Sequence, residues 1–163
     1  MISDRQTEMP RTVSVRNQIR NITVSPEGKR AVFEARGELF NAPIKGGYTI
    51  NLTQSSGAYD RDPSWSPDGK YIAFSSNRSG NTAVYIVSVS GGTPTRLTWH
   101  PANAIVRGWS GDNENVIFAT TRDSAPANTY FLWSVSRSGG PAKKLVAQWS
   151  FDGSISPDGK KII

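Results

Sequence analysis

His100 and the run Asp60-Arg61-Asp62 are the residues of this sequence whose types could do chemistry. A histidine can act as a general base toward a nucleophilic serine, but spacing alone ties no serine to His100. The two carboxylates could bind calcium or a cationic ligand, although the arginine between them favours mutual neutralisation. We therefore treat Asp60, Arg61, Asp62 and His100 as candidate ligand or junction residues, and we assign no catalytic, cofactor-binding or metal-binding residue.

A second charged pattern runs along FEARGELF, where Glu34, Arg36 and Glu38 alternate at the spacing of one face of a β-strand. Such a row could face a ligand. Solvated or cross-strand charge pairs are the stronger expectation, because opposite charges on neighbouring strands attract each other at this spacing.

The composition narrows the classes of protein to which this chain can belong. Its 163 residues, 36% of them hydrophobic, can bury the core of one domain. The absence of cysteine excludes disulfides, thiolate metal sites and a cysteine nucleophile. The net charge of +6 comes from basic residues scattered singly or in pairs, so we expect a solvated basic surface and no nucleic-acid partner.

The opening segment MISDRQTEMP lacks the apolar run of a secretory signal, and no stretch of the chain is apolar for long enough to cross a bilayer. We therefore expect no membrane partner. If Met1 is the natural start, a cytoplasmic location follows.

The elements that position these residues are indicated by two markers that recur in step. The first marker is a serine followed by a turn, in VSPEG, WSPDG, WSGDN and ISPDG, which places serines at 25, 66, 110 and 156. The second is a Gly-Gly pair ahead of Leu52-Thr53, Leu97-Thr98 and Leu145-Val146. A period of 41 to 46 residues indicates a repeat architecture.

Each repeat is predicted to contain four short strands. In the second repeat, PSWS leads into the turn Pro67-Asp68-Gly69, YIAFSS and AVYIVSVS follow, and TPTRLTW returns after the Gly-Gly turn. The third repeat has Asn113 in place of the turn glycine, and asparagine is the non-glycine residue that best tolerates the left-handed conformation. Trp65 and Trp109 precede their repeat serines where the other repeats have aliphatic residues, which predicts a packing position.

The predicted fold is all-β, a partial β-propeller with three complete four-stranded antiparallel blades and the start of a fourth. Strands that are apolar on both faces, such as YIAF, indicate sheets stacked on both sides, and a β-sandwich would not produce the period. The blades are expected at about 19–60, 61–104 and 105–148, with a partial blade at 149–163. Residues 1–18 are expected to form an arm whose segment Arg11–Arg16 could supply a blade-closing strand.

Residues 19–163 resemble a known group of repeats. SWSPDGKYIAFSSNRSGN and VYIVSVSGGTPTRLT are similar to TolB-like propeller repeats, and SPEGKRAVFEARGELF is especially similar to propeller segments of the tricorn protease family. The resemblance implies a propeller that filters or channels substrate toward a catalytic domain elsewhere. It also implies that the catalytic serine and histidine lie in separate domains, and nothing in this chain matches those.

The predicted function is therefore a non-catalytic scaffold or peptide- and protein-binding module, the substrate-gating propeller of a tricorn-like peptidase, without a cofactor. One alternative is a propeller hydrolase or lyase with a central site, and another is the propeller segment of a TolB-like or amidohydrolase-type protein. We expect protein or peptide partners, and self-association through open blade edges, because an unpaired sheet edge invites another strand.

Overall fold

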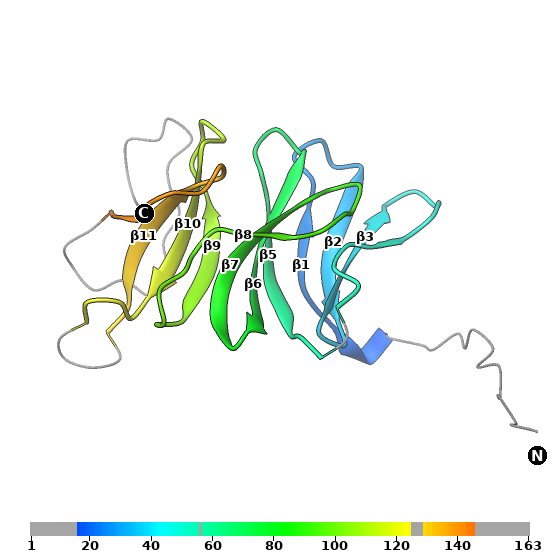
Figure 1. Ribbon diagram of the computed structural model, residues 1–163. Helices are drawn as coiled ribbons and strands as arrows, with labels where there is room; N and C mark the ends of the chain where they lie inside the picture. The colour runs from blue at the N-terminus through cyan, green and yellow to red at the C-terminus, as the bar shows by residue number, and fades with distance from the viewer. Residues whose placement is uncertain (1–15, 56, 125–128, 146–163) are drawn as a thin grey trace, which may run out of the picture.

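The computed structural model describes residues 16–55, 57–124 and 129–145, which form three four-stranded antiparallel sheets (Figure 1). In each sheet the strands lie in chain order, and we call the sheets blades 1, 2 and 3. Blade 1 contains β1 (Ile19–Val24), β2 (Arg30–Ala35), β3 (Glu38–Pro43) and β4 (Ile50–Asn51). Blade 2 contains β5 (Asp60–Trp65), β6 (Tyr71–Ser79), β7 (Asn81–Ser88) and β8 (Thr95–Arg96). Blade 3 contains β9 (Ala104–Trp109), β10 (Asn115–Thr120), β11 (Phe131–Ser136) and β12 (Lys143–Lys144).

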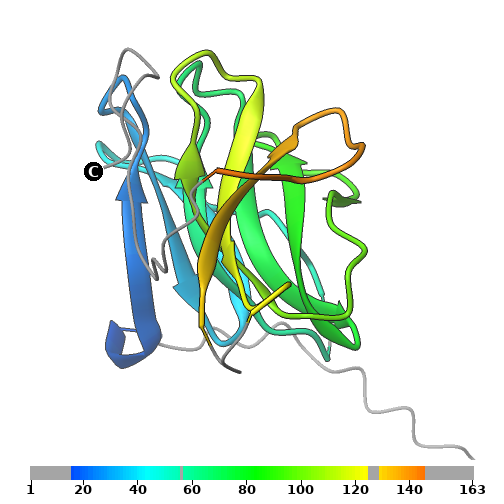
Figure 2. The ribbon, with the colours of Figure 1, turned by 90° about the vertical axis from the view of Figure 1, so that its left-hand side faces the viewer.

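The blades lie next to one another in chain order, from blade 1 on the right of Figure 1 to blade 3 on the left, and Figure 2 looks along this row so that the blades overlap. Their first strands contact one another, β1 against β5 and β5 against β9, so these three strands form the inner wall of the row. The one helical element among the described residues is the single 3₁₀ turn η1 (Arg16–Gln18). None of the helical segments in the described part of the chain is long and apolar enough to span a membrane.

The predicted fold class is confirmed for the three blades. The fourth-blade segment 149–163, and residues 11–15 of the predicted arm strand, lie outside the described residues.

The repeat serine closes the turn between the first two strands of each blade. Its hydroxyl oxygen accepts a hydrogen bond from the backbone N–H that opens the second strand, at 3.1 Å from Arg30 to Ser25, 2.9 Å from Tyr71 to Ser66 and 2.9 Å from Asn115 to Ser110. The third residue after each serine has a positive φ, namely 69° at Gly28, 68° at Gly69 and 64° at Asn113. The predicted left-handed conformation of Asn113 is confirmed.

The Leu-Thr marker fixes the path that follows the fourth strand. Leu52 and Leu97 are buried, and the hydroxyls of the threonines beside them accept backbone N–H groups of the third strand. Thr53 Oγ1 lies 3.1 Å from the nitrogen of Leu39, and Thr98 Oγ1 lies 2.9 Å from the nitrogen of Val84. Each threonine therefore continues the sheet where the short fourth strand has ended.

The described residues form three hydrophobic clusters, two between neighbouring blades and a smaller one, made of Ile117, Ala119 and Leu132, on the other face of blade 3. Val32, Leu39 and Phe74 belong to the cluster between blades 1 and 2, and Ile86, Phe118 and Val135 to the cluster between blades 2 and 3. Burial on both faces explains why the strands lack in/out alternation.

Trp65 and Trp109 each pack against the preceding blade, which confirms the packing position expected for them. They are 9% and 8% exposed. Trp65 Nε1 donates to the carbonyl oxygen of Thr23 at 3.2 Å, and Trp109 Nε1 donates to that of Ser64 at 3.1 Å. The indole thus fills the core and also ties neighbouring inner strands together.

Candidate functional site

The inner wall contains a polar groove of about 330 Å³ to which all three blades contribute. Its lining residues come from β1, β5 and β9: Asn21, Ile22, Thr23, Asp62, Pro63, Ser64, Val106 and Arg107. Because β1, β5 and β9 belong to three different blades, a ligand in this groove would touch every described blade.

The groove is shaped by irregularities in the inner strands. The pairing of β1 with β2 shifts between Arg20 and Thr23, and that of β5 with β6 shifts between Arg61 and Ser64. Within these shifts Asn21 and Asp62 have φ values of 48° and 53°. Bulges re-aim side chains, and positive φ in a non-glycine residue stores strain of the kind that gathers at ligand sites.

Asp62 is the electrostatically unusual residue of the groove. Its side chain is 24% exposed, and Oδ2 is buried without a hydrogen-bond partner, with Arg61 Nε at 3.6 Å. Burial raises the pKa of Asp62, and this rise is opposed by a hydrogen bond to Ser75 and by the charges of Arg61 and Arg107. A strained carboxylate with an unpaired oxygen and a raised pKa marks a candidate ligand contact.

Asp60 has a different environment, although it is only two residues away. It is fully buried, and Arg78 Nη2 donates to both of its carboxylate oxygens at 2.9 Å. The Ser55 hydroxyl donates to Oδ2 at 2.6 Å, while the Arg78 guanidinium lies over the rings of Phe74 and Tyr85. Asp60 therefore links the start of β5 to Arg78 in β6 and, through the Arg78 guanidinium, to the aromatic core of blade 2.

The first strand of the second repeat, predicted at PSWS, begins earlier in the structure and therefore includes the run Asp60-Arg61-Asp62. All three residues lie in β5, because Asp60 pairs with Ser76 and Arg61 with Ser75 before the bulge interrupts the ladder. Arg61 forms an ion pair with Asp62, and Asp60 forms one with Arg78.

Glu34 lies between blades 1 and 2 near the groove. Its two carboxylate oxygens accept hydrogen bonds from Asn21 Nδ2 at 2.9 Å and from the Tyr59 hydroxyl at 2.7 Å. The hydrogen bond to Glu34 raises the pKa of Tyr59. Arg36 has a φ of 56° and lies between β2 and β3, while Glu38 accepts from Asn51 Nδ2, so the three charges do not form one row.

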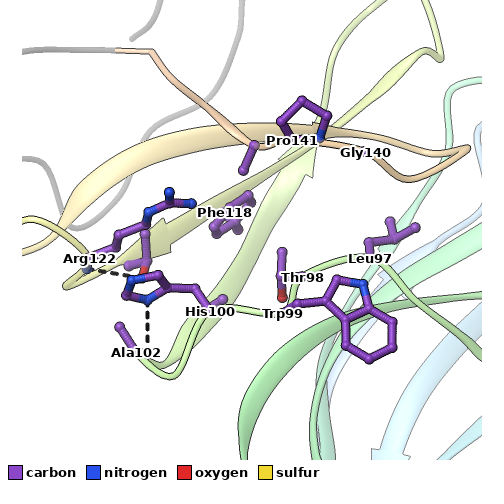
Figure 3. A pocket seen from close by; sticks show the side chains of 12 residues that line it. Leu97, Thr98, Trp99, His100, Ala102, Phe118, Arg122, Gly140 and Pro141 are labelled. Carbon is purple, nitrogen blue, oxygen red and sulfur yellow. Dashed lines mark hydrogen bonds between the residues drawn. The ribbon is translucent and has the colours of Figure 1, made fainter.

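His100 lies apart from the inner wall, in the loop between β8 and β9. Its Nδ1 accepts the backbone N–H of Ala102 at 3.1 Å, and its carbonyl oxygen accepts Asn81 Nδ2 at 3.0 Å. The ring borders a second groove of about 260 Å³, between the β8–β9 loop and blade 3 (Figure 3). No group of three or more histidine, cysteine, aspartate or glutamate side chains able to hold a metal ion occurs among the described residues.

A family model described as the tricorn protease N-terminal β-propeller domain matches residues 18–163. The chain belongs to this family. Tricorn protease homolog 1 of Streptomyces coelicolor is 31% identical over 121 residues, which make up 74% of this chain and 11% of that relative. The chain is thus a propeller segment of tricorn-like proteins, and it spans a small part of the relative's length.

Two solved structures place the fold of this tricorn-type propeller. One, described as a TolB from Agrobacterium tumefaciens, matches with a TM-score of 0.75 and 24% identity, over 88% of this chain and 52% of that chain. The tricorn protease itself matches with a TM-score of 0.58 and 15% identity, over 82% of this chain and 16% of that chain. At these identities the likeness establishes the fold alone.

The sequence of this tricorn-type propeller did not predict the roles of three arginines. Arg78, Arg107 and Arg122 were not singled out, because isolated arginines beside turns look like ordinary surface residues. For Arg107 a signal was available, since it occupies the inner strand of the third repeat close to the position that Asp62 holds in the second.

Proposed function

We propose that this chain is a non-catalytic propeller segment whose inner wall contacts peptides on their way to a catalytic domain outside it. In this proposal the groove at β1, β5 and β9 holds an extended peptide, and the Asp62 side chain turns so that Oδ2, which is covered in the free chain, accepts a hydrogen bond from a peptide N–H. The observation that carries the proposal is the Asp62 carboxylate in a groove shared by three blades, because its backbone is strained, its side chain is largely buried and its Oδ2 atom has no hydrogen-bond partner.

The physical argument rests on an unmade hydrogen bond. Leaving a buried acceptor unsatisfied costs about 1–3 kcal/mol, and a ligand donor recovers much of that cost. Backbone N–H groups recur along every peptide, so an acceptor of this kind holds chains of varied sequence. Such tolerance suits a gate through which many substrates pass.

The surroundings of His100 support a non-catalytic assignment. Its Nδ1 is engaged by the Ala102 N–H, and its loop lies away from the inner-wall groove. A general base needs a ring nitrogen within reach of the proton it abstracts. The alternative of a central hydrolase or lyase site is tested by His100→Ala, since loss of a measured activity in a folded variant would favour that alternative.

The binding proposal is tested with the 163-residue chain and a blocked, fluorescein-labelled polyalanine peptide, followed by fluorescence anisotropy. We expect wild type to bind the peptide without cleaving it, as judged by mass spectrometry, and Asp62→Asn to weaken binding several-fold. Asp123→Asn is the matched control, because Asp123 also has a positive φ (57°) but lies outside the groove. Equal binding by wild type and Asp62→Asn would contradict the proposal.

A further inference from the structure

The groove beside His100 has an apolar floor and a charged rim. Leu97, Ala104 and Phe118 are buried side chains of its lining, and Pro141 and Ala142 close it on the blade 3 side. In Figure 3, Arg122 and His100 lie on one side of Phe118, and Trp99 lies on the other. Trp99 is 74% exposed, which is unusual for so large an apolar side chain.

Arg122 contributes a guanidinium to this groove, and the lining residues that the structure describes include no carboxylate. Its guanidinium is stacked over the Trp133 ring at 4.6 Å from the ring centroid. Arg122 Nε forms an ion pair with Asp123 Oδ2 at 4.0 Å, a distance too long for a hydrogen bond, and Nε is buried without a hydrogen-bond partner. The positive charge at the groove is thus held in place by stacking, and one of its donors is unused.

The rim on the Trp99 side is held by contacts that leave much of the indole exposed. Arg96 Nε donates to the carbonyl oxygen of Thr98 at 2.6 Å, and the Arg96 guanidinium lies over the Trp99 ring at 4.6 Å from its centroid. A stacked cation on an exposed indole keeps the ring in a defined orientation without burying it.

We propose that this groove is a second peptide-binding site, specific for a short segment in which a carboxylate follows a large apolar side chain. The apolar side chain packs on Phe118 and Leu97, and the carboxylate turns the Arg122 guanidinium toward it, so that Nε and an Nη nitrogen donate in a side-on pair. The groove is smaller than most sites for drug-sized ligands, which suits one side chain with adjoining backbone. This site goes beyond the inner-wall function, because it lies on different strands and selects for charge.

The test uses isothermal titration of the 163-residue chain with acetyl-Ala-Leu-Glu-Ala-amide and with its Gln and Lys counterparts. We expect the Glu peptide to bind about tenfold more tightly than the Gln peptide, the usual size of a charge-assisted hydrogen bond, and the Lys peptide to bind most weakly. Arg122→Gln should erase the preference for Glu. Acetyl-Ala-Leu with a free C-terminal carboxylate distinguishes a chain terminus from an acidic side chain as the source of the carboxylate.

Arg137→Gln is the matched control. Arg137 has the same exposed fraction as Arg122 (34%) and also lies over an aromatic ring, that of Tyr71, but it is not part of the groove. Asp62→Asn should leave the preference unchanged, which separates this site from the inner wall. Equal affinity for the Glu and Gln peptides, loss of the preference in Arg137→Gln as well, or no binding at millimolar peptide would overturn the proposal.

Discussion

Asp62 carries several costs that a purely structural residue would avoid. Its backbone is left-handed, its Oδ2 atom has no hydrogen-bond partner, and burial raises its pKa. Neighbouring Asp60, in the same strand, has both oxygens paired and is fully buried. This contrast within one strand is the reason that we propose a binding role for Asp62 and a structural role for Asp60.

Asp62→Asn should raise the free energy of unfolding at neutral pH. Because the pKa of Asp62 is raised in the folded chain, folding favours the protonated form, and stability is lost as pH rises from the unfolded value of about 3.9 through the folded pKa. Asparagine removes this penalty and also tolerates positive φ. Urea unfolding at pH 7 and pH 3 should show a gain for the variant that is larger at pH 7, and a variant less stable than wild type at pH 7 would contradict this expectation.

Trp65→Ala should lower the free energy of unfolding by roughly 3–5 kcal/mol, the range for emptying a large aromatic site. The residue is 9% exposed and donates across the blade 1–2 junction. Trp99→Ala is the control, since Trp99 is 74% exposed and little core is lost with it. Denaturant melts followed by circular dichroism would show the difference, and similar midpoints for the two variants would refute the packing role.

At the scale of the element, the serine turns show how one conformation is reached with two residue types. Gly69 and Asn113 have nearly the same φ, 68° and 64°. A Cβ atom at Gly69 would meet only Pro26 Cδ, at an ordinary contact distance of 3.8 Å. Backbone strain, not crowding, therefore decides what this position accepts.

Gly69→Val should cost about 1–3 kcal/mol of stability, because a β-branched residue resists positive φ. Gly69→Asn should cost clearly less, since the third repeat already holds asparagine at the equivalent position. Thermal melts of the two variants measure the difference. Equal losses would show that something other than backbone conformation limits the turn.

The sequence was enough to predict the elements whose causes are local. Ser66 and Gly69 set a turn within a few residues, and Leu97-Thr98 ends a blade by contacts with its own third strand. The bulge at Asp62 and the pairing of Asp60 with Arg78 were not predictable in this way, because they depend on how β5 packs between neighbouring strands. The candidate residues were thus found by type, and their partners only by structure.

At the scale of the whole molecule, blade 1 leaves exposed the face that blades 2 and 3 each pack against the blade before them. Val24 occupies the position that Trp65 and Trp109 hold in the next two blades, where the side chain packs against a preceding blade. Val24 is 52% exposed, compared with 9% and 8% for the two tryptophans. We propose that the 163-residue chain uses this face and its blade edges to self-associate.

Light scattering coupled to size exclusion should find a dimer or larger assembly at micromolar concentration. Val24→Lys should shift the chain toward monomer, because a charge cannot be buried unpaired in such an interface. Lys70→Glu, on the exposed turn of blade 2, is the control for a charge change away from that face. A compact wild-type monomer under these conditions would end the proposal.

The chain order of strands within each blade also has a consequence for synthesis on the ribosome. Within each blade every strand pairs with its neighbour in sequence, and among the described residues the core between blades 1 and 2 uses none beyond Val89. Contacts of such short range form quickly, and in repeat proteins each unit depends mainly on the adjacent one. We therefore expect the first two blades to fold as a pair while the third is still being translated, so that each new blade is added to a template that is already ordered.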